Sequence, residues 1–165
     1  MNKERNKILY LCYSALIGAL YVALTWVSNV FGLASMAVQV RLSEALCVLS
    51  YFTPCAPVGM FVGCFISNLT MGSHILDIIF GSLATLIGAY LGTKTKNKWL
   101  VPVPTVIANT VVVPIVILFA YTEVRTVGAY LLTAIGVFAG EAVSAYLIGM
   151  VLLLAMEKHK IFKRK

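Results

Sequence analysis

The sequence predicts an all-α membrane protein, a bundle of six transmembrane helices that forms a single integral membrane domain over residues 1–165. Composition is the first observation: 61% of the residues are hydrophobic and 12% are charged, whereas soluble domains average about 25% charged residues. The second is the repetition of long apolar runs, each separated from the next by a short polar or proline-containing break. The third is the position of the basic residues, which flank these runs.

Six apolar runs are candidate spanning segments. They lie at roughly Ile8–Phe31, Leu42–Phe52, Val58–Met71, Ile75–Thr93, Trp99–Tyr121 and Val127–Met156. The first is longer than the apolar region of a secretory signal, which has about 7–15 residues, so we expect a retained helix. The second and third runs are short, and the prolines between them, Pro54 and Pro57, disfavour one continuous helix.

The basic residues indicate the orientation. The chain has thirteen Lys and Arg against six Asp and Glu, and eleven of the thirteen lie in the ends, at about 1–7 and 157–165, or in the loop at 94–98. Six spans put all eleven on one side and leave Arg41 and Arg125 on the other, whereas five spans would place one terminal cluster outside. Because Lys and Arg accumulate on the cytoplasmic side, we expect both ends in the cytoplasm. The clusters form no basic face or motif of the kind that binds nucleic acid.

No catalytic or cofactor chemistry is visible in the sequence. The four cysteines form no CxxC pair and no zinc spacing, so we interpret them as small buried hydrophobic residues; they are Cys12, Cys47, Cys55 and Cys64. Neither histidine has a nucleophile nearby, and no phosphate-binding GxxxxGK[ST] loop is present. We therefore expect a binding protein without cofactor or metal, in which any ATP is hydrolysed by another chain.

Polar side chains inside the apolar runs are the candidate binding residues. A charge at mid-bilayer costs at least about 2.5–3.5 kcal/mol, so such residues should face the protein interior. Most lie near the expected outer ends of their segments, with Asn109 and Glu141 deeper, which predicts a pocket that opens outward. The set comprises Arg41, Glu44, Asn68, His74, Asp77, Asn109 and Glu141, with Trp26, Tyr130 and Phe138 as aromatic neighbours.

Two of these interpretations have structural alternatives. Arg41 and Glu44 are three residues apart on one helical face and could pair with each other. Trp26 could belong to the aromatic belt at the membrane interface instead of the pocket. Glu141 has no cation at helical spacing in its own segment, which favours a ligand role. The apolar loop at 32–41 could fold back as a lid.

Small residues recur at four-residue spacing on two segments. Ala15, Ala19 and Ala23 form such a stripe on the first segment, and Gly136, Gly140 and Ser144 form another on the last. Such stripes allow close helix approach in lipid, either within the bundle or with a partner. We favour packing within the bundle for the second stripe.

Three stretches carry a resemblance to a known family. They are SALIGALYVALTWV at 14–27, VQVRLSEALCVLSYFTPCAPVGMFVGCFISNL at 38–69 and DIIFGSLATLIGAYLGTK at 77–94, and they resemble the QueT family. Its members are substrate-binding S components of energy-coupling factor (ECF) transporters for queuosine precursors. The resemblance implies a six-helix bundle in the bacterial plasma membrane. Its partners would be a transmembrane coupling protein, met through Ala15, Ala19 and Ala23, and two cytoplasmic ATPases.

The ligand that the resemblance implies is a 7-deazaguanine such as pre-queuosine-0, pre-queuosine-1 or queuine. A carboxylate of Glu141 or Glu44 could accept the adjacent N–H groups of its guanine-like edge. The donors to the O6 acceptor could be Arg41, Gln39 or Asn68. Asp77 could pair with the ammonium of an aminomethylated precursor, and Trp26 or Tyr130 could stack on the ring.

Two other functional classes remain open. One is a stand-alone secondary carrier or channel, although matched broken helices in two inverted halves are not visible. The other is a small membrane enzyme that uses Glu141 or Asp77 as a base, which the missing catalytic motif disfavours.

Overall fold

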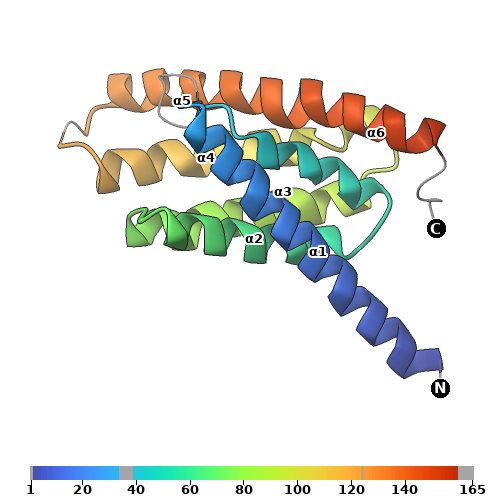
Figure 1. Cartoon of the computed structure of the whole chain (residues 1–165). Coiled ribbons are helices and arrows are strands. Elements are labelled where there is room, and N and C mark those ends of the chain that lie inside the picture. The colour runs from blue at the N-terminus through green and yellow to red at the C-terminus, as the bar shows by residue number, and fades with distance from the viewer. Residues whose placement is uncertain (1, 34–38, 124, 160–165) are drawn as a thin grey trace.

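The computed structural model describes residues 2–33, 39–123 and 125–159, and the described residues form helices without strands. Six α-helices and four irregularly wound helices follow one another along the described residues (Figure 1). In chain order they are α1 (Asn2–Val30), η1 (Leu42–Tyr51), α2 (Ala56–Thr70), η2 (Asp77–Gly81), α3 (Ser82–Lys94), η3 (Lys98–Leu100), α4 (Val103–Ala120), α5 (Val127–Glu141), η4 (Ala142–Ile148) and α6 (Gly149–Lys158). The predicted lid lies partly at 34–38, outside the described residues, as do the basic residues at 160–165.

The elements combine into the six predicted segments. η2 and α3 are continuous, and so are α5, η4 and α6, which together form the last segment. Three stretches are long and apolar enough to cross a membrane, namely Glu4–Val30, Lys98–Ala120 and Val127–Lys158. Two other apolar helices are shorter, η1 and α2. The chain therefore folds as an all-helical bundle typical of a membrane protein, and the predicted helix breaks are confirmed.

The prolines have the roles expected between the second and third segments. η1 ends at Tyr51, and Pro54 lies in the turn before α2. Pro57 occupies the first turn of α2, where its missing N–H removes no helical hydrogen bond. At the far ends, Gly32 and Gly72 lie two residues beyond the last residues of α1 and α2, and both have φ of 69°, a conformation that favours glycine.

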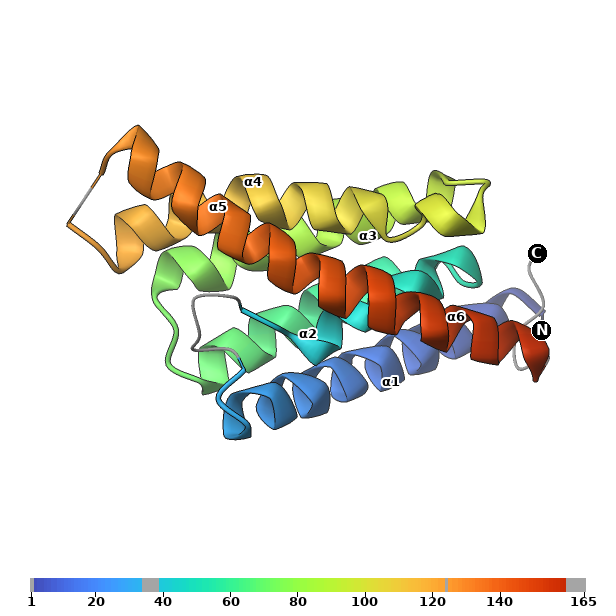
Figure 2. The same ribbon diagram turned by 90° about the horizontal axis from the view of Figure 1, so that it is seen from above.

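All connections alternate between the two ends of the bundle. Both termini lie at one end, together with the turn between α3 and α4 (Figures 1 and 2). An ion pair of 2.8 Å between Lys98 Nζ and Glu157 Oε2 joins this turn to α6. The chain segments after α1, α2 and α4 lie at the opposite end (Figure 2). The loop basic residues and the ends of the chain therefore gather at the same end of the bundle, as an even number of segments requires.

Close helix contacts are made by glycines rather than by the alanine stripe. A Cβ added at Gly59 would lie 2.6 Å from the Ser14 carbonyl oxygen, and one at Gly63 would lie 2.7 Å from that of Gly18. These glycines allow the backbones of α1 and α2 to touch. Ala15, Ala19 and Ala23 point away from this contact and are exposed, which leaves the stripe available on the outer surface of α1.

Candidate functional site

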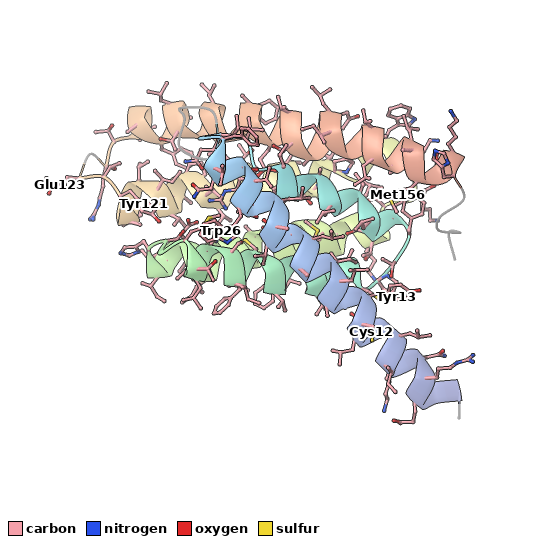
Figure 3. All side chains as sticks on the ribbon, in the orientation of Figure 1. Cys12, Tyr13, Trp26, Tyr121, Glu123 and Met156 are labelled. Carbon is pink, nitrogen blue, oxygen red and sulfur yellow. The ribbon has the colours of Figure 1, made fainter. Side chains whose placement is uncertain are left out.

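A large cavity lies at the end of the bundle opposite the termini. Its volume is about 470 Å³, within the range of roughly 300–1,000 Å³ that small-molecule sites have. Figure 3 shows one of its lining residues, Tyr121, at this end beside Glu123, far from Cys12 and Met156. We call it the outer cavity; it is lined by Thr25, Asn29, Gln39, Arg41, Asn68, Met71, Gly72, Ser73, Asp77, Val113, Ile117 and Tyr121.

A second, much smaller space adjoins the outer cavity. This inner cavity has a volume of about 10 Å³ and shares Gln39, Arg41 and Val113 with the outer one. Its other lining residues are Glu44, Gly81, Thr85, Asn109, Val137 and Glu141. The two cavities together collect most of the predicted binding residues, from five different segments of the chain.

Glu44 lies deeper than its sequence position indicated. The sequence placed it with the outer residues, but it lines the inner cavity with Asn109 and Glu141. The cause is the path of the chain before η1: Arg41 is extended, with φ of −101° and ψ of 102°, and the backbone of Gln39 passes directly over Gly140. This extended stretch, cyan in Figure 2, enters the bundle before the helix begins.

The carboxyl group of Glu44 is held by two hydroxyl groups. The Tyr21 hydroxyl donates to Glu44 Oε1, and the Thr85 hydroxyl donates to the same oxygen over 3.3 Å. Glu44 is 2% exposed, and its other oxygen, Oε2, has no hydrogen-bond partner. One oxygen thus orients the side chain, while the second is buried without a hydrogen-bond partner.

Glu141 and Asn109 form a similar arrangement. Asn109 Nδ2 donates to Glu141 Oε1 over 2.9 Å, which orients both side chains. Glu141 Oε2 and Asn109 Oδ1 are buried without partners. Because an unpaired buried polar atom costs about 1–3 kcal/mol, such atoms clustered in one cavity indicate a binding site for a hydrogen-bond donor.

Arg41 forms its ion pair with Asp77, and not with Glu44, which is its neighbour at helical spacing. Arg41 Nη2 lies 3.8 Å from Asp77 Oδ2, and the Asp77 side chain is 8% exposed. The structure therefore does not support the alternative that Arg41 and Glu44 only pair with each other. Asn68 lies beside this pair, and its Nδ2 donates to the Asp77 carbonyl oxygen over 3.3 Å.

The two predicted stacking residues lie elsewhere. Neither Trp26 nor Tyr130 is among the described residues that line the two cavities. Trp26 is 41% exposed on α1, and the Tyr130 hydroxyl donates to the Val111 carbonyl oxygen over 3.5 Å. Tyr121 is the aromatic residue of the outer cavity, and its hydroxyl accepts a hydrogen bond of 2.8 Å from the His74 backbone N–H.

The sequence analysis missed Tyr21 and Thr85, which hold Glu44. A signal for Tyr21 exists: Ser14, Tyr21, Thr25 and Ser28 follow one another at spacings of seven, four and three residues and are all buried. That spacing places polar groups on one face of an otherwise apolar helix. Thr85 has no comparable pattern, because its partner is distant in sequence.

The family model for the QueT transporter matches residues 11–158 of this chain. The chain belongs to the QueT family. This confirms the resemblance seen in the sequence. One curated relative, the queuosine precursor transporter QueT of Lactococcus lactis subsp. cremoris (strain MG1363), is 30% identical over 96 residues. The matched part covers 58% of this chain and about half, 56%, of the relative. No solved structure matches the chain.

Proposed function

We propose that this QueT family member is the substrate-binding S component of an ECF importer, and that it binds a 7-deazaguanine precursor of queuosine from outside the cell. The observation that carries the proposal is the set of buried, unpartnered acceptors in the inner cavity: Glu44 Oε2, Asn109 Oδ1 and Glu141 Oε2. A 7-deazaguanine precursor carries N–H donors on its ring and, in aminomethylated forms, on its 7-substituent, and a donor that reaches these acceptors would satisfy groups that otherwise weaken the fold. The name of the relative, a queuosine precursor transporter, supports the same ligand class.

The orientation follows from the positive-inside bias. We place the chain as a multi-pass protein in a bacterial plasma membrane, with both ends and the loop at 94–98 in the cytoplasm. The outer cavity, at the opposite end of the bundle, then opens to the exterior. This arrangement suits capture of a scarce solute from outside.

Delivery of the ligand requires partners in this proposal. The described side chains include no group of metal-ligating residues, and the sequence has no phosphate-binding loop of the GxxxxGK[ST] type. We assign ATP hydrolysis to two cytoplasmic ATPases and force transmission to a transmembrane coupling protein. The exposed stripe of Ala15, Ala19 and Ala23 is the surface we expect the coupling protein to meet.

Equilibrium binding to the purified chain in detergent tests the ligand assignment. The titrants are pre-queuosine-0, pre-queuosine-1, queuine and guanine, without any partner protein. Tight binding of at least one deazaguanine, with guanine much weaker, is the expected result. Absence of binding by protein that is demonstrably folded would remove the deazaguanine assignment.

Reconstitution in liposomes tests the need for partners. The chain alone should bind ligand without accumulating it, and accumulation should require the coupling protein, the ATPases and ATP. Uptake by the chain alone, driven by an ion gradient, would instead establish a secondary carrier. Chemical conversion of the ligand by the chain would establish an enzyme.

A further inference from the structure

The size of the inner cavity restricts what can enter it. A volume of about 10 Å³ corresponds to roughly one water-sized group. A fused two-ring heterocycle cannot enter this space, but a single small polar group at the end of a substituent can. The outer cavity, with about 470 Å³, has room for the ring system of the same ligand.

Three acceptor oxygens without partners belong to residues that line the inner cavity, beside Gln39 and Arg41. Glu44, Asn109 and Glu141 are 2%, 3% and 6% exposed, and each has one oxygen without a partner. The Asn109 amide N–H₂ already donates to Glu141 Oε1, whereas its oxygen is buried without a partner. A group that satisfies these three oxygens must donate several hydrogen bonds.

A primary ammonium meets these requirements. It carries three N–H donors and no acceptor, and its donors match the three oxygens in number. The guanine-like edge fits less well, because its O6 and N3 acceptors flank the N1 and N2 donors and would face further oxygens. A hydroxyl group has one donor and would leave two of the three oxygens unpaired.

The charges of the side chains in the site also favour a bound cation. The guanidinium of Arg41 is engaged by Asp77 at 3.8 Å. Glu44 and Glu141 have no Lys or Arg partner within ion-pair distance among the described residues. In the described part of the chain, Arg41 is thus the one guanidinium beside three carboxyl groups, those of Asp77, Glu44 and Glu141. A bound ammonium compensates the remaining desolvated carboxyl groups through charge-assisted hydrogen bonds.

We propose that the inner cavity is an ammonium subsite, formed by Glu44, Asn109 and Glu141, that selects precursors with a 7-aminomethyl substituent. This inference rests on the proposed function and specifies its substrate. The ligand enters amine first, and its ring lies in the outer cavity near Asn29, Asn68 and Tyr121. Glu141 and Glu44 thereby take the role that the sequence had suggested for Asp77, which is occupied by Arg41.

Two ligands that differ in one substituent test the proposal. Pre-queuosine-1 carries an aminomethyl group, whereas pre-queuosine-0 carries a linear, uncharged nitrile with no donor. Wild-type protein should bind pre-queuosine-1 about 10- to 100-fold more tightly, the range for one to two lost charge-assisted hydrogen bonds. Glu141→Gln should weaken pre-queuosine-1 binding about tenfold or more and change pre-queuosine-0 binding less than about threefold. Glu157→Gln is the control, because it removes a carboxyl group that pairs with Lys98 at the other end of the bundle.

The outcomes separate the subsite from the proposed function. Equal or tighter binding of pre-queuosine-0, or an equal loss of both ligands in folded Glu141→Gln, would refute the ammonium subsite while deazaguanine binding stands. No binding of any deazaguanine by folded wild-type protein would refute both. If Glu141→Gln does not fold, pre-queuosine-1 acetylated on its amine provides the test on wild-type protein. Acetylation removes the charge and adds bulk, so affinity should fall about 100-fold or more, and unchanged affinity would refute the subsite.

Discussion

Replacement of Gly140 by alanine tests whether residues 39–41 pass in close contact over α5. A Cβ at this position would lie 2.6 Å from the Gln39 carbonyl carbon, and closer still to its oxygen, whereas ordinary contacts begin at 3.4 Å. The extended stretch at 39–41 must therefore move by at least about 0.8 Å, the difference between these two distances. Backbone atoms cannot relieve the clash by changing rotamer. We expect a strain of about 1–3 kcal/mol, which exceeds or cancels the helix propensity of about 1 kcal/mol that alanine gains over glycine.

The assay compares Gly140→Ala with Gly128→Ala in the same helix. A Cβ at Gly128 meets no atom within 4 Å, so that variant should be as stable as wild type or slightly more stable. Gly140→Ala should unfold at a lower temperature in detergent and bind deazaguanine more weakly, because Gln39 and Arg41 are displaced. If Gly140→Ala matched Gly128→Ala in both measurements, the close passage of residues 39–41 over α5 would be refuted.

Three further changes test other parts of the structure. Tyr21→Phe removes the hydroxyl that donates to Glu44, so chemical denaturation should show a loss of about 1–3 kcal/mol; wild-type stability would contradict this hydrogen bond. Lys98→Ala removes a partly exposed ion pair with Glu157 and should cost at most about 1 kcal/mol, with a difference that shrinks as salt is added. Ala19→Leu should impair uptake by the assembled transporter and leave ligand binding intact, and equal loss of both would indicate a packing role.

The positions of the helices follow from local features of the sequence. The apolar runs mark the segments. The second segment ends before Pro54, because proline has no backbone N–H to continue the hydrogen bonding of a helix. The cost of polar groups in lipid correctly brought Glu44, Asp77, Asn109 and Glu141 to the same two cavities. Their role in ligand binding stays a prediction. These inferences succeed because solvation and backbone chemistry depend on residue type alone.

Other features depend on contacts between distant parts of the chain. The pairing of Arg41 with Asp77 joins residues that belong to different segments, and helical spacing could only suggest Glu44 as the partner. The depth of Glu44 depends on the passage of Gln39 over Gly140, about a hundred residues away in sequence. Trp26 and Tyr130 were wrongly expected in the pocket, because an aromatic side chain near the end of a segment can face either the pocket or the membrane interface. The identity of an aromatic residue alone does not indicate which way its side chain faces.

The acidic residues of the site coincide with departures from regular α-helix. Glu44 lies in η1, a 3₁₀ helix of ten residues, although such helices rarely exceed three or four residues. Ten residues span about 20 Å as a 3₁₀ helix and about 15 Å as an α-helix. The larger rise per residue therefore lets η1 extend further along the bundle than an α-helix with the same number of residues. Asp77 begins the π-helical η2, and Glu141 directly precedes the π-helical η4.

These irregular windings connect the fold to the site. A π turn holds more residues than an α turn, so it changes which side chains face the bundle after it. η2 carries Asp77 at its start and Gly81 at its end, and a Cβ at Gly81 would lie 2.9 Å from Asp77 Oδ1. The same turn thus positions the partner of Arg41 and leaves space in the wall of the inner cavity, which Gly81 lines. Each of the three carboxyl groups therefore lies in, or directly beside, an irregularly wound stretch of backbone.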